Sequence, residues 1–399
     1  MKVLLVLIIV GAVAVAATVD WRFWDRYVRF TLTPLNERGP DMYQPRFVLG
    51  GVPRPLEVAP EDSRTISPDA LDAAAAYAES MNSNGLIVWR DGAIQFERYW
   101  NGNDAESMAT TYSMHKTIVA LMIGIAVDDG KIADIDQPAA TYITEWQNDA
   151  RRDITIRNLL QMAGGLENFA LSEMPWSKAL HLNYDSDRVA AVMAYPAVTP
   201  PGTEFKYNGT ETQALLIVLE RATGKSYGAY MQEKLWGPAG NGPGFLWLDR
   251  PGGTALAHIA LYGSHRDWVR FGEVFLGRGR IRDRQIVSES WIAQMTTPSP
   301  LNPKYGFQTW LGSPYVAVRT YSRESGVVTK ASEPFLAPDL YFADGFGAQR
   351  LYVIPSERLL IVRSGETRMD WDDSKLPNLI LRGLKDSSSG PAVEPPETE

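Results

Sequence analysis

The sequence of 399 residues contains no cysteine. This absence excludes disulfide bonds, thiol nucleophiles, and zinc or iron–sulfur sites built on cysteine. Histidine is also scarce, with four residues at positions 115, 181, 258 and 265. No HExxH motif occurs, and His258 and His265 are seven positions apart rather than four, so the pattern of a helical zinc site is missing. We therefore expect a protein that uses no metal ion and no organic cofactor.

A strong excess of positive charge is missing as well. The net charge is −8 and is spread along the chain, which does not favour a nucleic-acid partner. Hydrophobic residues make up 45% and charged residues 22%, the balance of an ordinary globular protein. A chain of this length buries a large core without disulfides, as one large domain or two interleaved ones.

One long hydrophobic run is present, at the N-terminus. Lys2 precedes an uncharged apolar stretch from Val3 to Val19, which Asp20 closes. Residues 1–20 are typical either of a signal peptide, with an Ala14-Val15-Ala16 cleavage pattern, or of a membrane anchor at the lower length limit. The alternating aromatic and arginine residues that follow suit a membrane interface. Both interpretations predict a cell-envelope protein, either anchored facing the periplasm or exterior, or secreted to the periplasm.

The order of the expected elements predicts the fold class. Residues 21–65, rich in Pro, Gly and Arg, read as an extended lead-in, and residues 85–99 read as a hairpin around Asp91-Gly92. Mostly helical segments follow over about 113–275, and then strand patterns return. The remaining expectations are strands at 350–354 and 359–363, a short helix at 376–384, and a disordered tail at 385–399.

Strands therefore come first, then helices, then strands again. This order predicts an α/β (α+β) fold over residues 66–384, in which an antiparallel sheet is assembled from both ends of the chain. Helices would cover the sheet on both faces, and the all-helical lobe would be an insertion between its strands.

The first candidate for chemistry is the sequence Ser113-Met114-His115-Lys116, an S-x-x-K motif. At positions i and i+3 of a helix, the serine and lysine side chains share one face. The positive end of the helix favours a developing alkoxide on Ser113, and a neutral Lys116 can accept the hydroxyl proton. His115 points to another face, and we expect it to pack locally.

Four segments in this order resemble the serine β-lactamase and penicillin-binding-protein superfamily, nearest to its class C-like esterases and 6-aminohexanoate-dimer hydrolases. Residues 113–130 are similar to the nucleophile helix, and residues 154–166 to the "TI..LL...SGL" stretch. Residues 201–209 resemble "PG..F.Y(S)N", and residues 345–349 resemble "GHGGQ". The resemblance implies that fold and a hydrolase with a nucleophilic serine.

The resemblance also implies roles for individual residues. Tyr207 would be the tyrosine of the second motif, and beside the Lys116 ammonium its phenol would ionise near neutral pH and shuttle protons. The asparagine that the family places two residues later is Gly209 here, so its orienting amide is either missing or supplied by Asn208.

The third motif implies the substrate-binding strand. The family's K-T-G or H-x-G aligns with Phe346-Gly347-Ala348, so the lysine is absent. By analogy, the backbone N–H groups of Ser113 and Gln349 would form the oxyanion hole. β-Lactams and peptidoglycan stems carry a carboxylate that needs a cation, so Phe346 favours small ester or amide substrates. Arg319 or Arg350, reaching the same place, would reverse this expectation.

Two alternatives to this esterase or amidase remain open from the sequence: a β-lactamase or D,D-peptidase, and a non-enzymatic binding module with the same fold. A third alternative is an α/β-hydrolase that uses Ser226, in the G-x-S-x-G sequence at 224–228, as its nucleophile. No strand leads into that motif, so we expect Ser226 to cap a helix instead. The oligomeric state is left open.

Overall fold

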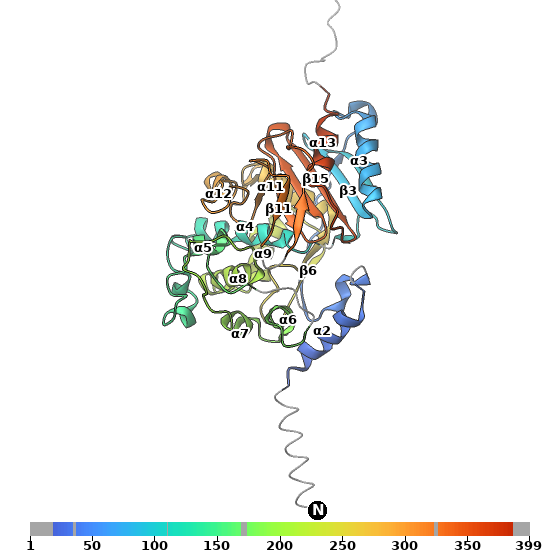
Figure 1. The fold of residues 1–399 in the computed structure, drawn as a ribbon. Helices are drawn as coiled ribbons and strands as arrows, with labels where there is room; N and C mark the ends of the chain where they lie inside the picture. Colours follow the sequence, from blue (N-terminus) through green and yellow to red (C-terminus); the bar gives the residue numbers. More distant parts are fainter. Residues whose placement is uncertain (1–18, 35–36, 110, 169–173, 323–325, 386–399) are drawn as a thin grey trace, which may run out of the picture.

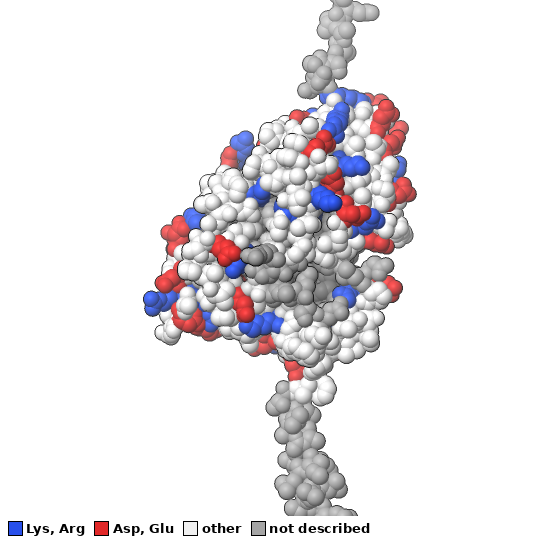
Figure 2. All heavy atoms as spheres, viewed as in Figure 1, with Lys and Arg blue, Asp and Glu red and all other residues white. Residues whose placement is uncertain are grey.

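The computed structural model describes residues 19–34, 37–109, 111–168, 174–322 and 326–385. The expectations for a signal or anchor at residues 1–20 and for a disordered tail at 385–399 therefore lie almost entirely outside the described residues. Across these described ranges, no helix has the length and apolar character needed to cross a membrane. Charged side chains of both signs are scattered over the visible surface, in line with the charge distribution along the chain (Figure 2).

A seven-stranded sheet forms one half of the molecule (Figure 1). In spatial order its strands are β10 (Trp310–Leu311), β13 (Tyr341–Gly345), β14 (Gln349–Ile354), β15 (Leu359–Gly365), β3 (Ser83–Arg90), β4 (Ala93–Tyr99) and β2 (Glu57–Val58). Every pair is antiparallel except β2 with β4. Because β15 pairs with β3, the sheet joins the two ends of the domain, as the sequence predicts.

Helices cover both faces of this sheet, because strand side chains alternate between faces. Leu359 and Ile361 of β15 pack toward one layer, whereas Leu360 and Val362 pack toward the other. The first layer contains α3 (Pro68–Ser80) and α13 (Lys375–Leu381), and the second contains α4 (Met114–Asp128) and α11 (His265–Leu276). The predicted fold class is confirmed.

The helical part of the molecule packs against the buried helix α4. Its helices are α5 (Ile156–Leu160), α6 (Lys178–Tyr184), α7 (Arg188–Met193), α8 (Gly209–Thr223), α9 (Tyr227–Met231) and α10 (Gly237–Ala239), with α12 (Glu289–Met295) farther along the chain. Single turns of helix lie at Pro40–Met42, Glu61–Ser63, Ala139–Thr141, Thr144–Trp146 and Pro355–Glu357, and a π-helical turn at Gln232–Trp236.

This helical lobe is shorter than the expected 113–275. β6 (Gly244–Trp247) and β7 (Leu261–Ser264) belong to a second sheet, of order β1-β6-β7-β5, with β1 (Arg46–Leu49) and β5 (Met108–Ala109). α11 packs mainly on the seven-stranded sheet, against β3, β14 and β15. β6 has four buried residues in a row, so it lacks the alternation by which a strand is recognised in sequence. A short hairpin, β11 (Val318–Thr320) with β12 (Val328–Lys330), and a second one, β8 (Arg280–Ile281) with β9 (Arg284–Gln285), complete the strands.

The extended lead-in expected at 21–65 is wrong in its first part. Trp21–Leu32 forms the helix α2, whose first turn is capped by Asp20, and the Asp20 carboxylate accepts from the Phe23 N–H over 3.1 Å. Its buried side chains are Phe23, Arg26 and Phe30, three and four positions apart, which is the spacing of one helical face. The arginine-rich composition hid this spacing, because Arg26 is one of the buried residues.

Candidate active site

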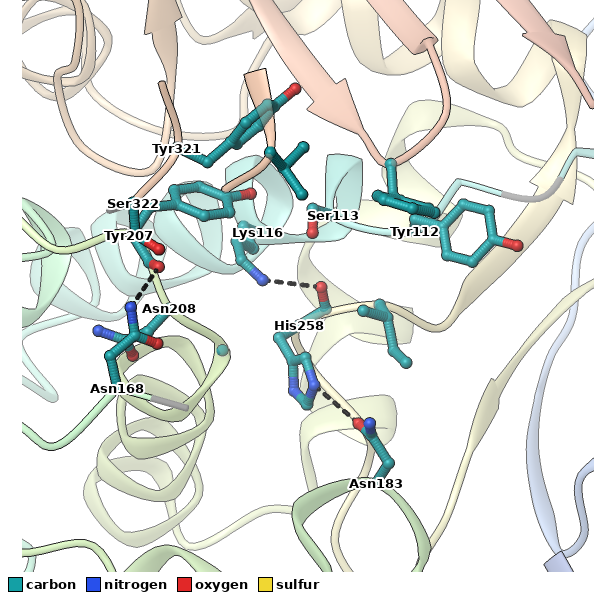
Figure 3. Close-up of a pocket in the computed structure, with 14 residues that line it drawn as sticks. Tyr112, Ser113, Lys116, Asn168, Asn183, Tyr207, Asn208, His258, Tyr321 and Ser322 are labelled. Carbon is teal, nitrogen blue, oxygen red and sulfur yellow. Dashed lines mark hydrogen bonds between the residues drawn. The ribbon is translucent and has the colours of Figure 1, made fainter. Parts of the chain in front are cut away.

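Ser113 lies at the N-terminus of α4, directly after a sharp turn of the backbone. Thr111 Oγ1 fixes the preceding segment by donating to the Leu261 carbonyl oxygen over 2.7 Å. Tyr112 has a φ of +43°, a left-handed conformation that costs a non-glycine residue on the order of 1–3 kcal/mol. Ser113 is the N-cap of α4, yet its hydroxyl caps no backbone N–H. The hydroxyl is therefore available to the cleft in front of it (Figure 3).

Lys116 follows one helical turn later and is almost completely buried. Its Nζ donates to the carbonyl oxygen of His258 over 3.0 Å and lies 5.3 Å from the centre of the Tyr207 ring. It forms no ion pair with a described carboxylate. Burial lowers the pKa of Lys116 to about 7, although the negative charge of Asp344 acts in the opposite direction. A lysine with this pKa is neutral in a large fraction of molecules at neutral pH and can accept a proton.

Tyr207 lies directly before the N-cap of α8, with its ring among other aromatic side chains. Burial and the charge of Asp344 raise its pKa well above the usual value, and a side-chain hydrogen bond with Ser113 lowers it only in part. The expectation that this phenol ionises near neutral pH is therefore wrong. The ring packs on Trp310, with ring centres 5.6 Å apart, and this burial outweighs the Ser113 hydrogen bond and the charge of Arg319, which both favour a phenolate. Tyr207 is a neutral hydrogen-bonding group beside Ser113.

These three residues meet in one cleft of about 240 Å³ (Figure 3). It is lined by Tyr112, Ser113, Lys116, Asn168, Asn183, Tyr207, Asn208, Gly209, His258, Ile259, Tyr321, Ser322, Val327 and Phe346. Lys116 is the one lining residue with an ionic side chain among the described residues, apart from His258, whose pKa is held well below its usual value by burial and by the nearby Lys116 charge. The cleft thus offers aromatic and amide groups around a single titratable amine.

Asn208 lines the cleft, but its side chain is used by the fold. Its Oδ1 accepts from the Glu211 N–H over 2.8 Å, which caps α8, and its Nδ2 donates to the Lys206 carbonyl oxygen over 2.8 Å. Both ends of the Asn208 amide are therefore hydrogen-bonded within the fold, which disfavours the hypothesis that Asn208 replaces the family's orienting asparagine. A Cβ atom at Gly209 would lie 2.7 Å from Cδ2 of His258, so the imidazole fills the space that a side chain there would need.

The third motif lies at the turn between β13 and β14. Phe346 lines the cleft and packs edge-on against Tyr112, with ring centres 5.9 Å apart. Gly347 and Ala348 line a neighbouring small hollow instead, and Gln349 lies opposite Gly345 in the strand register. The Gln349 side chain is tied to Gly365 in both directions at 2.9 Å. Of the four residues predicted here, only Phe346 reaches the cleft that contains Ser113.

Two backbone N–H groups at this end of the cleft have no protein acceptor within the described part of the chain. One belongs to Ser113 and the other to Phe346. The predicted second donor, Gln349, lies opposite Gly345 in the β13–β14 register and does not line the cleft. Both residues are half-buried and line the cleft, so both N–H groups are candidates to bind a ligand oxygen.

Arg319 and Arg350 do not enter the cleft. Arg319 donates to Asp344 and to Asp373 over 2.8 Å in each case. Arg350 donates to Asp373 over 2.7 and 3.0 Å and also pairs with Asp344. The four side chains are buried, and the hydroxyl of Tyr321 hydrogen-bonds to Asp344 as well. We call these four residues the Arg–Asp cluster; it uses both arginines within the fold.

The other expectations resolve simply. Ser226 is exposed and caps α9, where its Oγ accepts from the Ala229 N–H over 3.4 Å, as predicted. His115 is buried and hydrogen-bonds to the Tyr227 hydroxyl over 2.9 Å, also as predicted. The prediction missed the polar cleft residues on the helical side, Asn168 and Asn183. A signal existed for neither, because isolated asparagines in loops and short helices are common.

The chain is similar to known hydrolases and penicillin-binding-protein homologues in sequence and in fold. A sequence model of the family described as Beta-lactamase matches residues 72–368. A 6-aminohexanoate-dimer hydrolase of Paenarthrobacter ureafaciens is 22% identical over 225 residues, which cover 54% of this chain and 57% of that protein. The chain therefore spans little more than half of this curated relative.

Among solved structures, a family VIII carboxylesterase matches with a TM-score of 0.61 at 18% identity, covering 85% of this chain and 100% of that one. A penicillin-binding protein homologue from Caulobacter crescentus matches with a TM-score of 0.60 at 15% identity, covering 80% and 99%. At such identities the two structures establish a shared fold.

Proposed function

Because this chain belongs to the beta-lactamase family, we propose that it is a serine hydrolase that cleaves small ester or amide substrates through an acyl-enzyme on Ser113. The family relationship, with esterases and a 6-aminohexanoate-dimer hydrolase among its relatives, supports hydrolysis in general. The observation that carries the specific proposal is the pKa of about 7 that burial gives to Lys116, one turn away from Ser113. Burial also lowers the pKa of Lys304, to about 8, but Lys304 lies outside the cleft, so it is the position of Lys116 beside Ser113 that makes this pKa useful to a general base.

The proposed proton route uses the groups already described. Neutral Lys116 accepts the proton of the Ser113 hydroxyl as its Oγ bonds to the substrate carbonyl carbon. The resulting ammonium then returns the proton to the leaving alcohol or amine, and the carbonyl–heteroatom bond breaks. Water repeats the sequence on the acyl-enzyme, releases the acid and restores the Ser113 hydroxyl. Neutral Tyr207 serves as a hydrogen-bonding partner of Ser113 throughout, rather than as a phenolate.

The oxyanion would be held by the N–H groups of Ser113 and Phe346. Both residues line the cleft, and both N–H groups lack protein acceptors among the described residues. The helix N-terminus at Ser113 adds its positive dipole end. Phe346 replaces Gln349 in this proposal, because Phe346 lines the cleft and Gln349 does not.

The substrate class follows from what surrounds the reacting atoms. Among the described residues that line the cleft there is no arginine, and the single lysine is the proposed base, so none of these residues is a further cation for a substrate carboxylate. A lost charge-assisted hydrogen bond costs about 1.5–3 kcal/mol, which disfavours β-lactams and peptidoglycan stems. The rings of Phe346 and Tyr321 and the side chains of Ile259 and Val327 instead suit an uncharged, apolar acyl or alcohol group.

A fluorophosphonate probe tests the nucleophile. We expect one adduct, on the peptide that contains Ser113, and complete loss of labelling in Ser113→Ala. Ser226→Ala is the matched control, because Ser226 is an exposed helix cap and its loss should leave labelling intact. A folded wild-type protein that is not labelled would favour the binding module, and labelling that depends on Ser226 would overturn the assignment.

A substrate comparison tests the specificity. We expect higher kcat/KM for p-nitrophenyl acetate and butyrate than for a chromogenic cephalosporin, by roughly 10–150-fold for the missing charge-assisted contact. Equal turnover of the cephalosporin would refute the argument from the uncharged cleft and favour a β-lactamase.

We also propose that residues 1–20 deliver the domain across a membrane into the cell envelope, as a retained anchor. The uncharged run of residues 3–19 supports this placement. Fractionation of a C-terminally tagged chain should find it at full length in membranes. A soluble protein that begins near Ala17 would identify a cleaved signal peptide instead.

A further inference from the structure

Helix α2 exposes an apolar stripe on its outer face. The stripe consists of Trp21, Trp24, Val28 and Leu32, with 63%, 42%, 48% and 77% of their surface exposed. They are spaced three, four and four positions apart, so they share one face of the helix. Exposed apolar residues scattered singly are common, but a continuous stripe on one helix marks an interaction surface. Over α2, the surface in Figure 2 is mostly free of charged side chains.

The opposite face of α2 is attached firmly to the domain. Phe23 stacks on His181 with ring centres 4.6 Å apart. The buried guanidinium of Arg26 donates to the carbonyl oxygens of Tyr184 and Asp249, each over 2.7 Å, and lies 4.0 Å above the Tyr43 ring. α2 therefore cannot turn its stripe inward, because that would leave the Arg26 charge and the carbonyl groups without partners.

The chemistry around the stripe indicates what covers it. Two of its four residues are tryptophans, which favour the boundary between lipid headgroups and acyl chains. Arg22 and Arg29 lie exposed beside it, and Arg29 pairs with Asp25 over 2.9 Å. Directly before α2, residues 3–19 carry no charge at all. Exposed tryptophans, flanking arginines and a preceding uncharged run are together typical of an amphipathic helix in a membrane surface. Binding of a protein partner does not require this combination.

We propose that α2 lies in the plane of a membrane, with Trp21, Trp24, Val28 and Leu32 inserted at the headgroup boundary and its inner face holding the domain. The contact fixes the orientation of the whole domain on the lipid surface, because the Arg26 hydrogen bonds join α2 rigidly to the rest of the protein. This proposal is independent of the hydrolase assignment.

The absence of cysteine makes a site-specific test direct. A single cysteine is introduced by Val28→Cys in the full-length chain and labelled with an environment-sensitive nitrobenzoxadiazole dye. The protein is reconstituted into vesicles of phosphatidylcholine and phosphatidylglycerol, with and without nitroxide-labelled acyl chains. Ser290→Cys on α12, exposed and remote in sequence from α2, is the matched control.

We expect a blue shift and nitroxide quenching for the dye at position 28, and neither for the dye at position 290. Adding Leu32→Gln to the Val28→Cys chain should diminish both signals without lowering the melting temperature, because 77% of the Leu32 surface is exposed. A dye at position 28 that stays in water, while the protein is bound to vesicles, would overturn the proposal. So would a shift that needs no vesicles and grows with protein concentration, because a second copy would then cover the stripe.

Discussion

The protein buries positive charge in two ways, at two neighbouring sites. Lys116 lies beside the ring of Tyr207, and Arg319 lies beside the ring of Tyr321, which contacts Tyr207. Lys116 faces a carbonyl oxygen and a tyrosine ring, and its pKa falls to about 7. Arg319 and Arg350 are buried as deeply, but each contacts Asp344 and Asp373. The pKa of Arg319 is held well above its usual value by Tyr321 and these two carboxylates, despite burial. Burial is common to both sites, so the partner decides whether the charge persists.

The two sites use their buried cations differently. Arg319 and Arg350 hold separate segments together, whereas Lys116 is able to exchange a proton. The Arg–Asp cluster pairs each arginine with both carboxylates and joins β11, β13, β14 and the segment before α13. Lys116 lacks a counter-ion in contact, so its proton is easily given up at neutral pH. Asp344 belongs to the cluster yet still raises the pKa of Lys116 from a distance, which couples the two sites.

The largest expected effect comes from making the lysine site permanently charged. Lys116→Arg should lower kcat/KM for p-nitrophenyl butyrate by at least roughly 10²–10⁴-fold, because a guanidinium cannot accept the Ser113 proton. Lys304→Arg is the matched control, since Lys304 is also buried and donates to a carbonyl oxygen, of Gly312, over 2.6 Å but lies outside the cleft. Activity near that of the wild type in Lys116→Arg would remove the lysine from the mechanism.

Removing one charge from the Arg–Asp cluster should mainly cost stability. Asp344→Asn leaves the buried charges of Arg319 and Arg350 with one carboxylate fewer, and breaking such a pair typically costs about 3–5 kcal/mol. Denaturant unfolding measures this loss. Asp339→Asn is the control, because Asp339 is on the surface and accepts from Ser356 over 2.8 Å. Equal stability of the two variants would show that the cluster is not needed to hold the wall.

A smaller effect is expected from crowding His258, whose carbonyl oxygen accepts the Lys116 hydrogen bond. Gly209→Ala places a Cβ 2.7 Å from the His258 ring, and overpacking of this kind costs typically about 1–3 kcal/mol. His258 also provides the carbonyl oxygen for Lys116, so kcat/KM should fall together with stability. Gly50→Ala, where nothing lies within 4 Å of the added Cβ, should change neither. A fully active, fully stable Gly209→Ala would mean that His258 moves aside freely.

The pH dependence should show the smallest and most direct difference. Activity requires neutral Lys116, so kcat/KM should rise with pH, about tenfold per unit below the pKa, and level off above about 7. Asp344 raises this pKa, so the rising limb should move to lower pH in Asp344→Asn. Arg319 and Arg350 do not titrate in this pH range, so they add no further change to the dependence of kcat/KM on pH. A profile that is flat from pH 5 to 8, or a shift in the opposite direction, would contradict the proposed base.

The sequence predicted those parts whose signals are local. The hairpin around Asp91-Gly92, the helix that begins after Ser113 and the cap at Ser226 each depend on a few neighbouring residues, and each is present in the structure. The sheet built from both chain ends also followed, because strand and helix patterns change along the chain in a clear order.

Features that depend on distant contacts were missed. The Arg–Asp cluster joins residues from three separate segments, and nothing near Asp344 or Asp373 in sequence indicates that they meet. Burial of Tyr207 was equally hidden, so its expected ionisation was judged from one neighbour, Lys116, instead of its whole surroundings. The helix α2 was read as extended because an arginine on its buried face interrupts the apolar pattern.

The pairing of β3 with β15 has a consequence for how the protein is made. Residues 83–90 leave the ribosome more than 250 residues before residues 359–365, the strand that completes their pairing. Ser113 is thus made long before β13 supplies the opposite wall of its cleft. Pairings this distant in sequence form slowly. We expect nascent chains that stop before residue 341 to be inactive, because they lack β13 and the Phe346 side of the cleft.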